Sequence, residues 1–208
     1  MTNILRRATR VEFDDDGTCR AYSANEDLLS EFSTPYDPEH NSQFETPITK
    51  DGRFLLMGSW RFGLLCYDVH GGELVWKKGP GKIRNIFLFQ DRVISEVCDI
   101  GLQERDLKRG GLIHRYSMPS VECLFKIAKN EIFTGPKSRK YFLMRIPGFL
   151  EVRELPQSLL NPHDCTSFHI ANVDRKGRNL IIWGTEEFPK RNLNKPGRQH
   201  FRRIVSIG

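Results

Sequence analysis

The sequence predicts an all-β fold built from repeated antiparallel meanders, and three observations support this prediction. Short apolar runs recur along the chain, and turn residues such as glycine, proline and aspartate separate them. The runs begin at nearly regular intervals. Almost no segment has a sustained helical period, and the best short exception is 25–32, where Asn25 is a candidate N-cap.

The composition is that of one folded domain. The chain has 208 residues, of which 38% are hydrophobic and 28% charged, which is enough for a buried core. No stretch approaches the roughly 20 apolar residues of a membrane span, and the N-terminus lacks the apolar segment of a secretory signal. The five cysteines include no Cys-x-x-Cys pair, so reduced thiols are expected. We therefore expect a cytoplasmic protein without a membrane partner.

The most regular region is a predicted meander of three strands between residues 49 and 78. Asp51-Gly52 precedes its first strand, and His70-Gly71-Gly72 separates the last two, as a tight hairpin requires. The three predicted strands are Arg53–Ser59, Phe62–Asp68 and Glu73–Lys77.

Similar predicted units follow along the rest of the chain. The next strands are expected at 83–89, 92–99, 111–117 and 121–127, with the polar segment 101–110 as an excursion between two of them. A hairpin with Pro147-Gly148 at its turn joins 141–146 to 149–154. A last pair, 166–173 and 179–184, flanks Asp174–Gly177, and 201–207 is consistent with a final strand.

The spacing of these units predicts a small or incomplete β-propeller-like array. Strands that begin at Arg53, Arg92, Lys140 and Arg178 are separated by about 39, 48 and 38 residues, near the roughly 40 to 50 residues of a propeller blade. We expect about four antiparallel meander blades in one domain spanning 1–208. The expected blades are 44–78, 83–127, 131–160 and 164–208, with an N-terminal hairpin, 10–22, closing the last.

One segment also resembles a known repeat family. Asp51-Gly-Arg-Phe-Leu-Leu-Met-Gly-Ser-Trp60, followed by Leu65-Cys-Tyr-Asp-Val-His-Gly-Gly-Glu-Leu-Val-Trp76, is similar to a WD40 or quinoprotein-type repeat. The segment 174–184 matches only the opening half. The chain has no Gly-His dipeptide, and Tyr67-Asp68 stands where that family has Trp-Asp. The resemblance implies a β-propeller repeat protein.

Charge is distributed unevenly along the chain. Between residues 11 and 50 there are ten acidic residues and two basic ones, whereas from Phe188 to the end there are six basic residues and no acidic one. The sequence therefore predicts an acidic N-terminal end and a basic C-terminal end.

One group of candidate ligands is His163, Asp164, Cys165 and His169. Alternate residues of a strand face opposite sides, so His163, Cys165 and His169 share a face only in an uninterrupted strand. A metal site there would need further ligands. Ordinary strand residues are the favoured interpretation.

A second group, Asp14-Asp15-Asp16-Gly17-Thr18, is superficially similar to a calcium loop. The closing glutamate is missing, because Asn25 occupies its position. A hairpin turn explains the same residues.

The familiar catalytic signatures are missing. Gly71-Gly72 and Gly79-Pro-Gly81 lack the context of a phosphate loop, and there is neither a Gly-x-Ser-x-Gly nor a His-Glu-x-x-His pattern. We therefore expect no enzyme activity, no cofactor and no metal. An active site assembled from separate blades stays open as a third hypothesis.

The first functional hypothesis is a protein-binding module, because a propeller-like array presents loops at two rims. An immunity or antitoxin-type protein that occludes a toxin is a concrete version. Aromatic and arginine side chains are the usual interface anchors, although Trp60 and Trp76 fit blade packing equally well. The candidate partner-binding residues are Trp60, Arg61, Arg105, Lys108, Arg109, Lys137, Arg139 and Lys190.

The alternative hypothesis is nucleic-acid binding through the C-terminal basic segment, whose cations would neutralise phosphates. A solvated loop and a strand explain the same residues and are favoured. The candidate residues are Lys190, Arg191, Lys195, Arg198, Arg202 and Arg203.

Overall fold

The structure is a computed structural model, and it describes residues 7–36, 47–79, 81–118, 121–136, 141–146, 148–155, 167–187 and 198–207. Every regular element in these ranges is a β-strand, and all strand pairs are antiparallel. The predicted all-β, propeller-like array is therefore confirmed. Two compact units make up the chain, Met1–Pro119 and Ser120–Gly208, where the sequence suggested a single domain.

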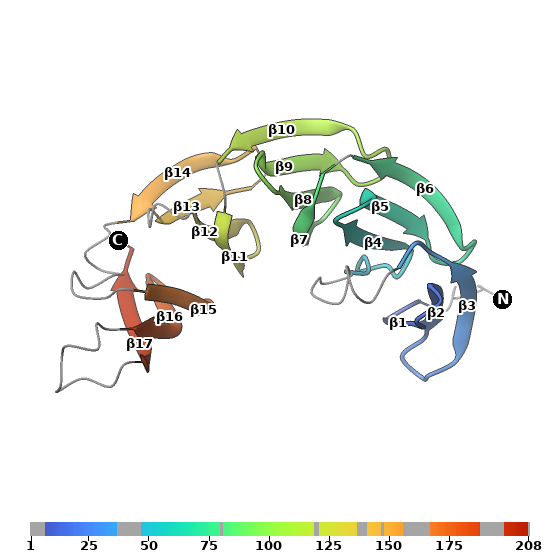
Figure 1. Cartoon of the computed structure of the whole chain (residues 1–208), viewed down its shortest axis with the longest axis horizontal. Helices are drawn as coiled ribbons and strands as arrows, with labels where there is room; N and C mark the ends of the chain where they lie inside the picture. Colours follow the sequence, from blue (N-terminus) through green and yellow to red (C-terminus); the bar gives the residue numbers. More distant parts are fainter. Residues whose placement is uncertain are drawn as a thin grey trace. The chain divides into compact units, whose positions relative to one another are not determined.

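The N-terminal unit contains three sheets of consecutive strands (Figure 1). The first comprises β1 (Arg10–Phe13), β2 (Thr18–Tyr22) and β3 (Leu28–Ser33). The second comprises β4 (Phe54–Ser59), β5 (Gly63–Asp68) and β6 (Glu73–Lys78). The third comprises β7 (Ile83–Phe89), β8 (Arg92–Val97), β9 (Gly101–Asp106) and β10 (Leu112–Ser117).

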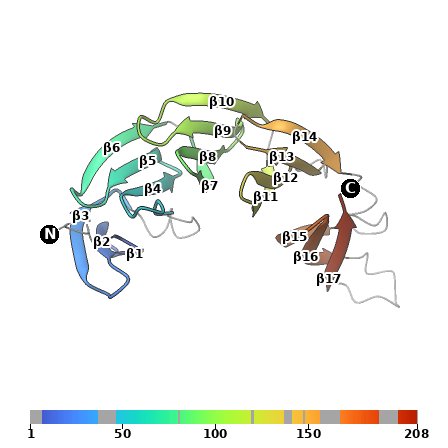
Figure 2. The same ribbon diagram turned by 180° about the vertical axis from the view of Figure 1, so that it is seen from behind.

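The C-terminal unit contains two further sheets, also built from consecutive strands (Figure 2). One comprises β11 (Val121–Ala128), β12 (Glu131–Pro136), β13 (Tyr141–Arg145) and β14 (Leu150–Leu155). The other comprises β15 (Ser167–Lys176), β16 (Asn179–Glu187) and β17 (Arg198–Ser206). The predicted final strand is thus present.

The sheet order differs from the predicted blades first at the expected second blade, 83–127, which is divided between two sheets. β9 completes the sheet of β7, β8 and β10, while β11 pairs with β12 in the next sheet. The polar residues of 101–110 predict an excursion between two strands. In the structure Gln103 and Glu104 are buried strand residues, and their polarity concealed β9.

The N-terminal hairpin was also assigned wrongly. β1 and β2 pair with β3 in a sheet of their own and are not part of the β15–β17 sheet. The short helical period at 25–32 does not correspond to a helix, since Leu28–Ser33 is a strand. The hydroxyl oxygen of Ser23 accepts hydrogen bonds from the backbone N–H groups of Asn25 and Asp27, at 3.1 and 3.2 Å. These bonds form a turn instead of a helix N-terminus.

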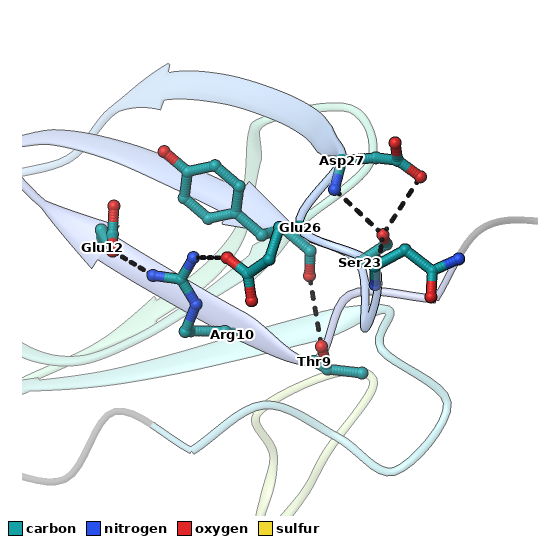
Figure 3. A network of polar contacts seen from close by, with 8 residues as sticks. Thr9, Arg10, Glu12, Ser23, Glu26 and Asp27 are labelled. Atoms are coloured by element: carbon teal, nitrogen blue, oxygen red, sulfur yellow. Dashed lines mark hydrogen bonds and ion pairs between the residues drawn. The ribbon is translucent and has the colours of Figure 1, made fainter.

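Arginines neutralise part of the acidic charge on this first sheet. Figure 3 shows Arg10 forming ion pairs with both Glu12 and Glu26. Arg20 pairs in the same way with Asp14 and Glu31, each at 2.6 Å. The acidic run of the sequence is therefore partly neutralised within its own sheet.

Neighbouring sheets within each unit pack face to face. Side chains of β4 and β5 alternate between two cores, because successive strand residues point to opposite faces. Leu55, Met57 and Leu65 pack with Cys19 and Ala21 of β2. On the other face, Phe54, Leu56, Leu64 and Trp76 pack with Ile83, Ile86 and Val93 of the third sheet. In the C-terminal unit a cluster of buried side chains joins the β11–β14 sheet to the β15–β17 sheet.

The segment that resembles a propeller repeat has a local structural reason for its aspartates. A carboxylate oxygen of Asp51 accepts hydrogen bonds from the Thr49 hydroxyl at 2.5 Å and from the Arg53 backbone N–H at 3.1 Å. Asp68 accepts bonds from the backbone N–H groups of His70 and Gly71, and it pairs with Arg53 at 3.1 Å. Both aspartates therefore fix the turns that begin and join the strands of this sheet.

Candidate binding surface of the N-terminal unit

The turn between β4 and β5 is held by hydrogen bonds and by a close contact with β6. The hydroxyl oxygen of Ser59 accepts hydrogen bonds from the backbone N–H groups of Arg61 and Phe62, at 3.1 and 3.2 Å. Gly63 has a φ of +82°, and a methyl group on its α-carbon would overlap the carbonyl oxygen of Lys78. Only glycine fits this position, so the turn is fixed against the end of β6.

Three cations lie over aromatic rings at this turn. The Lys82 ammonium is 4.8 Å from the centre of the Trp60 ring. Phe62 lies near both Arg61 and Lys77, at 5.3 and 5.0 Å. We call these five residues the aromatic–basic rim. Trp60 keeps 38% of its surface exposed, so the rim presents a large aromatic group among positive charges.

A pocket of about 200 Å³ opens next to the rim, between β6 and the third sheet. Its apolar walls include Leu64, Ile83 and Val97, and Gly79 and Gly81 line it where the chain passes from β6 to β7. Its polar lining consists of Lys78, Gln103, Arg105 and Arg115. None of the described lining residues is acidic, so we call this cavity the basic pocket.

Strand register brings the polar groups of the basic pocket together. Gln103 and Arg105 are two residues apart on β9 and therefore face the same side. Arg115 of β10 lies directly opposite Gln103 in the ladder. Arg105 donates hydrogen bonds to the Gln103 side-chain oxygen at 2.7 Å and to the carbonyl oxygen of Gly110 at 3.0 Å. The guanidinium of Arg105 is thereby held in one orientation.

The electrostatics of the basic pocket are unfavourable for its own cations. Burial, and then the positive charge of Arg115, lower the pKa of Arg105 from its ordinary value of 12.5. Arginine stays charged at neutral pH even after such a shift. The pocket therefore holds fixed positive charges near one another in a partly desolvated space.

Lys108 and Arg109, two more predicted partner-binding residues, lie on the β9–β10 turn and are exposed. The carbonyl oxygen of Leu107 in this turn accepts a hydrogen bond from the Trp76 indole at 2.7 Å. Trp76 itself is buried, as its packing interpretation predicted. The structure thus places Trp60, Arg61, Arg105, Lys108 and Arg109 in the N-terminal unit. Lys137, Arg139 and Lys190 lie outside the described residues.

The candidate nucleic-acid residues that can be described lie on β17, beside acidic residues of β16. Arg203 pairs with Glu186 at 2.5 Å, and Arg198 approaches Glu187 at 4.0 Å. Arg202 lies over the ring of Trp183, 6.0 Å from its centre. Lys190, Arg191 and Lys195 lie outside the described residues. Part of the predicted basic surface is therefore neutralised by the neighbouring strand.

The two groups of candidate ligands differ in how far the structure describes them. His169 is an exposed residue of β15, whereas His163, Asp164 and Cys165 lie outside the described residues. Asp16 accepts a hydrogen bond from the Thr18 backbone N–H at 2.8 Å, and the bond lowers the pKa of this carboxyl. The turn interpretation of 14–18 is confirmed. Among the described residues no three histidine, cysteine, aspartate or glutamate side chains are grouped to hold a metal ion.

Several residues of this surface were missed in the sequence. Lys77, Lys78, Lys82, Gln103 and Arg115 come from three strands and a connection, and they meet only because the second and third sheets pack together. The run Lys77-Lys78-Gly-Pro-Gly-Lys82 was a visible local signal. Nothing in the sequence pairs Arg115 with Gln103, because that contact depends on strand register.

No protein-family model and no curated protein matches this chain. Among solved structures, it is similar to the dihydro-heme d1 dehydrogenase NirN in complex with DHE, with a TM-score of 0.64 and 12% identity, over 91% of this chain and 43% of that one. It is also similar to BamB from Moraxella catarrhalis, with a TM-score of 0.58 and 10% identity, over 86% and 60% of the two chains.

A third similar structure is the computationally designed Ika8 protein, with a TM-score of 0.54 and 13% identity, over 88% of this chain and 58% of that one. The chain thus spans about half the length of these proteins. NirN and BamB are β-propeller proteins, and likeness at such low identity shows the propeller-like fold alone. In the part of the chain that the structure describes, there is also no helix with the length and apolar character of a membrane span.

Proposed function

We propose that this chain is a non-enzymatic protein-binding module that contacts an acidic face of its partner through the aromatic–basic rim. The observation that carries the proposal is the exposed Trp60 with Lys82 over its ring, next to Phe62, which lies near Arg61 and Lys77. Tryptophan and arginine are enriched among residues that dominate binding energy. A turn already fixed by Ser59 and Gly63 loses little conformational entropy when a partner binds.

The same geometry favours a protein over a nucleic acid as the partner. Single-stranded nucleic acids bind by stacking their bases on open aromatic faces. Lys82 lies over the Trp60 ring, and Phe62 is half-buried against the core between the first and second sheets. The cations remain at the surface, where they can pair with carboxylates of a protein. Complementary charge of this kind mainly raises the association rate.

The test is capture of the tagged chain's partner from its own cells, with nuclease treatment and across a salt series. The wild type is compared with a Trp60→Ala, Arg61→Glu double variant and with Arg202→Glu on β17 as the control. We expect one stoichiometric protein that survives nuclease, is lost with the double variant and is kept by the control. The narrower hypothesis of an immunity or antitoxin-type protein predicts that this partner is a toxin.

Two outcomes would overturn the proposal. One is retention of the partner by the Trp60→Ala, Arg61→Glu variant, because the rim would then not be the contact surface. The other is recovery of nucleic acid that disappears with nuclease or modest salt, which would indicate that the chain binds nucleic acid through a phosphate-binding surface.

A further inference from the structure

The basic pocket has the features of a binding site for a small anion. Lys78, Arg105 and Arg115 are contributed by β6, β9 and β10. Gln103 adds an amide side chain between the two arginines. At about 200 Å³, the pocket is smaller than the roughly 300–1,000 Å³ that drug-sized ligands occupy. It therefore suits a charged group with a short attachment.

The arrangement of the cations determines which kind of anion fits. Two guanidinium groups and an ammonium group line the pocket from three strands, so an anion in it could accept hydrogen bonds from more than one of them. A phosphate group carries close to two negative charges at neutral pH and several acceptor oxygens. A carboxylate carries one charge and two oxygens in one plane. Charge and donor number both favour the phosphate.

The pocket is also built before any ligand arrives. Gln103 and Gly110 hold Arg105 in place. A methyl group added to Gly110 would approach the Trp76 ring at 2.7 Å and Lys78 at 2.8 Å, so the β9–β10 turn fits closely against β6. An anion in the pocket would relieve the repulsion between Arg105 and Arg115. The site thus gains electrostatic stabilisation without a conformational change.

We propose that the basic pocket binds a phosphate group through Lys78, Arg105 and Arg115. The group comes either from a free phosphorylated small molecule or from a phosphorylated residue of a protein. This inference stands apart from the proposed protein-binding function, because a phosphate probe requires no partner.

The experiment is calorimetric titration of the full chain with inorganic phosphate at constant ionic strength. Arg115→Gln is the main variant, since Arg115 is exposed and its replacement leaves the Arg105 hydrogen bonds in place. Arg109→Gln is the matched control, because it removes the same charge from the neighbouring turn outside the pocket lining. We expect saturable binding to the wild type and to Arg109→Gln, and at least tenfold weaker binding to Arg115→Gln.

Further titrations identify the source of the phosphate group and test the competing explanations. A phosphoserine peptide that binds more tightly than inorganic phosphate identifies a protein-borne group, and the reverse order identifies a free one. Equal binding of acetate, equal loss in Arg109→Gln, or unchanged binding in Arg115→Gln would each overturn the proposal. Trp60→Ala should leave phosphate binding unchanged, so failure of the rim as a contact surface is distinguishable from failure of the pocket.

Discussion

Two basic regions of this protein carry similar residues but present different surfaces. On β17, Arg202 and Arg203 lie over the rings of Trp183 and Phe201, but Arg198 and Arg203 also lie beside Glu187 and Glu186 of the paired strand. On the aromatic–basic rim, Arg61, Lys77 and Lys82 lie over aromatic rings, and none of the described ion pairs involves them. An aromatic ring attracts a cation without cancelling its charge, whereas a carboxylate cancels it. The number of basic residues in a segment therefore does not measure the positive charge that a partner meets.

The largest expected effect tests whether the rim is rigid. Gly63→Ala places an alanine at a φ of +82°, and its new methyl group would overlap the Lys78 carbonyl oxygen. We expect the free energy of unfolding to fall by about 2–4 kcal/mol, measured by urea denaturation.

Gly177→Ala is the matched control for this substitution. Gly177 has a φ of +61°, but no heavy atom lies within 4 Å of the added methyl group. It should cost about 1 kcal/mol, which is the penalty of the left-handed backbone conformation alone. Equal losses for the two variants would show that the close contact at Gly63 does not constrain the turn.

The second prediction tests whether glutamates of β16 neutralise the positive charge of β17. Glu186 is buried and accepts hydrogen bonds from Arg203 at 2.5 Å and from Gln199 at 2.9 Å. Glu186→Gln should cost about 1–3 kcal/mol of stability, because the charged hydrogen bonds of Arg203 are weakened. It should also increase retention of the chain on heparin, since the positive charge of Arg203 is no longer balanced.

Glu187→Gln provides the comparison, because Glu187 is 4.0 Å from Arg198 in an exposed pair. Such pairs contribute roughly 0–1 kcal/mol, so its stability should change little. If Glu186→Gln left heparin retention as it was, the β17 cations would already be available to anions, and the contrast between the two regions would fail.

Much of the fold could be predicted from the sequence. Alternation, turns and spacing predicted the all-β array, and Asp51 and Asp68 fix turns where the repeat pattern placed them. Strand β9 was missed because Gln103 and Glu104 are polar yet buried. Their burial depends on neighbouring strands and sheets, which local hydrophobicity does not record.

The candidate site was predicted less completely than the fold. Trp60, Arg61 and Arg105 were singled out as exposed or loop residues that fit an interface. Lys78 and Arg115 were not, since Lys78 approaches Arg105 only through the packing of two sheets and Arg115 only through the register of β9 and β10. The run of six basic residues after Phe188 was conspicuous in the sequence. Its neutralising acids lie on β16, across the strand ladder, and only the register reveals the pairing.

The third prediction provides a probe specific for the N-terminal unit. Burial raises the pKa of the Cys19 and Cys66 thiols to about 12, from an ordinary value of 9.0. Their thiolates therefore form in the unfolded chain at a lower pH than in the folded one. Stability should be unaffected well below pH 9, then fall by about 1.4 kcal/mol per pH unit for each cysteine until pH approaches 12.

The measurement is urea denaturation between pH 8 and 10 in a chain whose Cys98, Cys123 and Cys165 are replaced by serine. Alkylation of the native form should be slow, and it should become fast when the N-terminal unit unfolds. The same reagent then reports whether Gly63→Ala destabilises this unit. Rapid labelling of the native chain at pH 8 would contradict the burial of both thiols.

The smallest expected effect concerns a single rim cation. Lys82→Gln removes the ammonium group 4.8 Å from the Trp60 ring, an interaction that contributes roughly 0.5 kcal/mol at an exposed site. Stability should therefore change by no more than about that amount, and Lys108→Gln should change it less still.

Retention on heparin should nevertheless fall with Lys82→Gln, because a cation over an aromatic ring keeps its charge. The corresponding Arg203→Gln variant should lower retention less, since Glu186 already balances that guanidinium. A larger loss of retention with Arg203→Gln than with Lys82→Gln would mean that pairing across the β16–β17 ladder does not screen the arginines. The number of basic residues in a segment would then measure the positive charge that it presents.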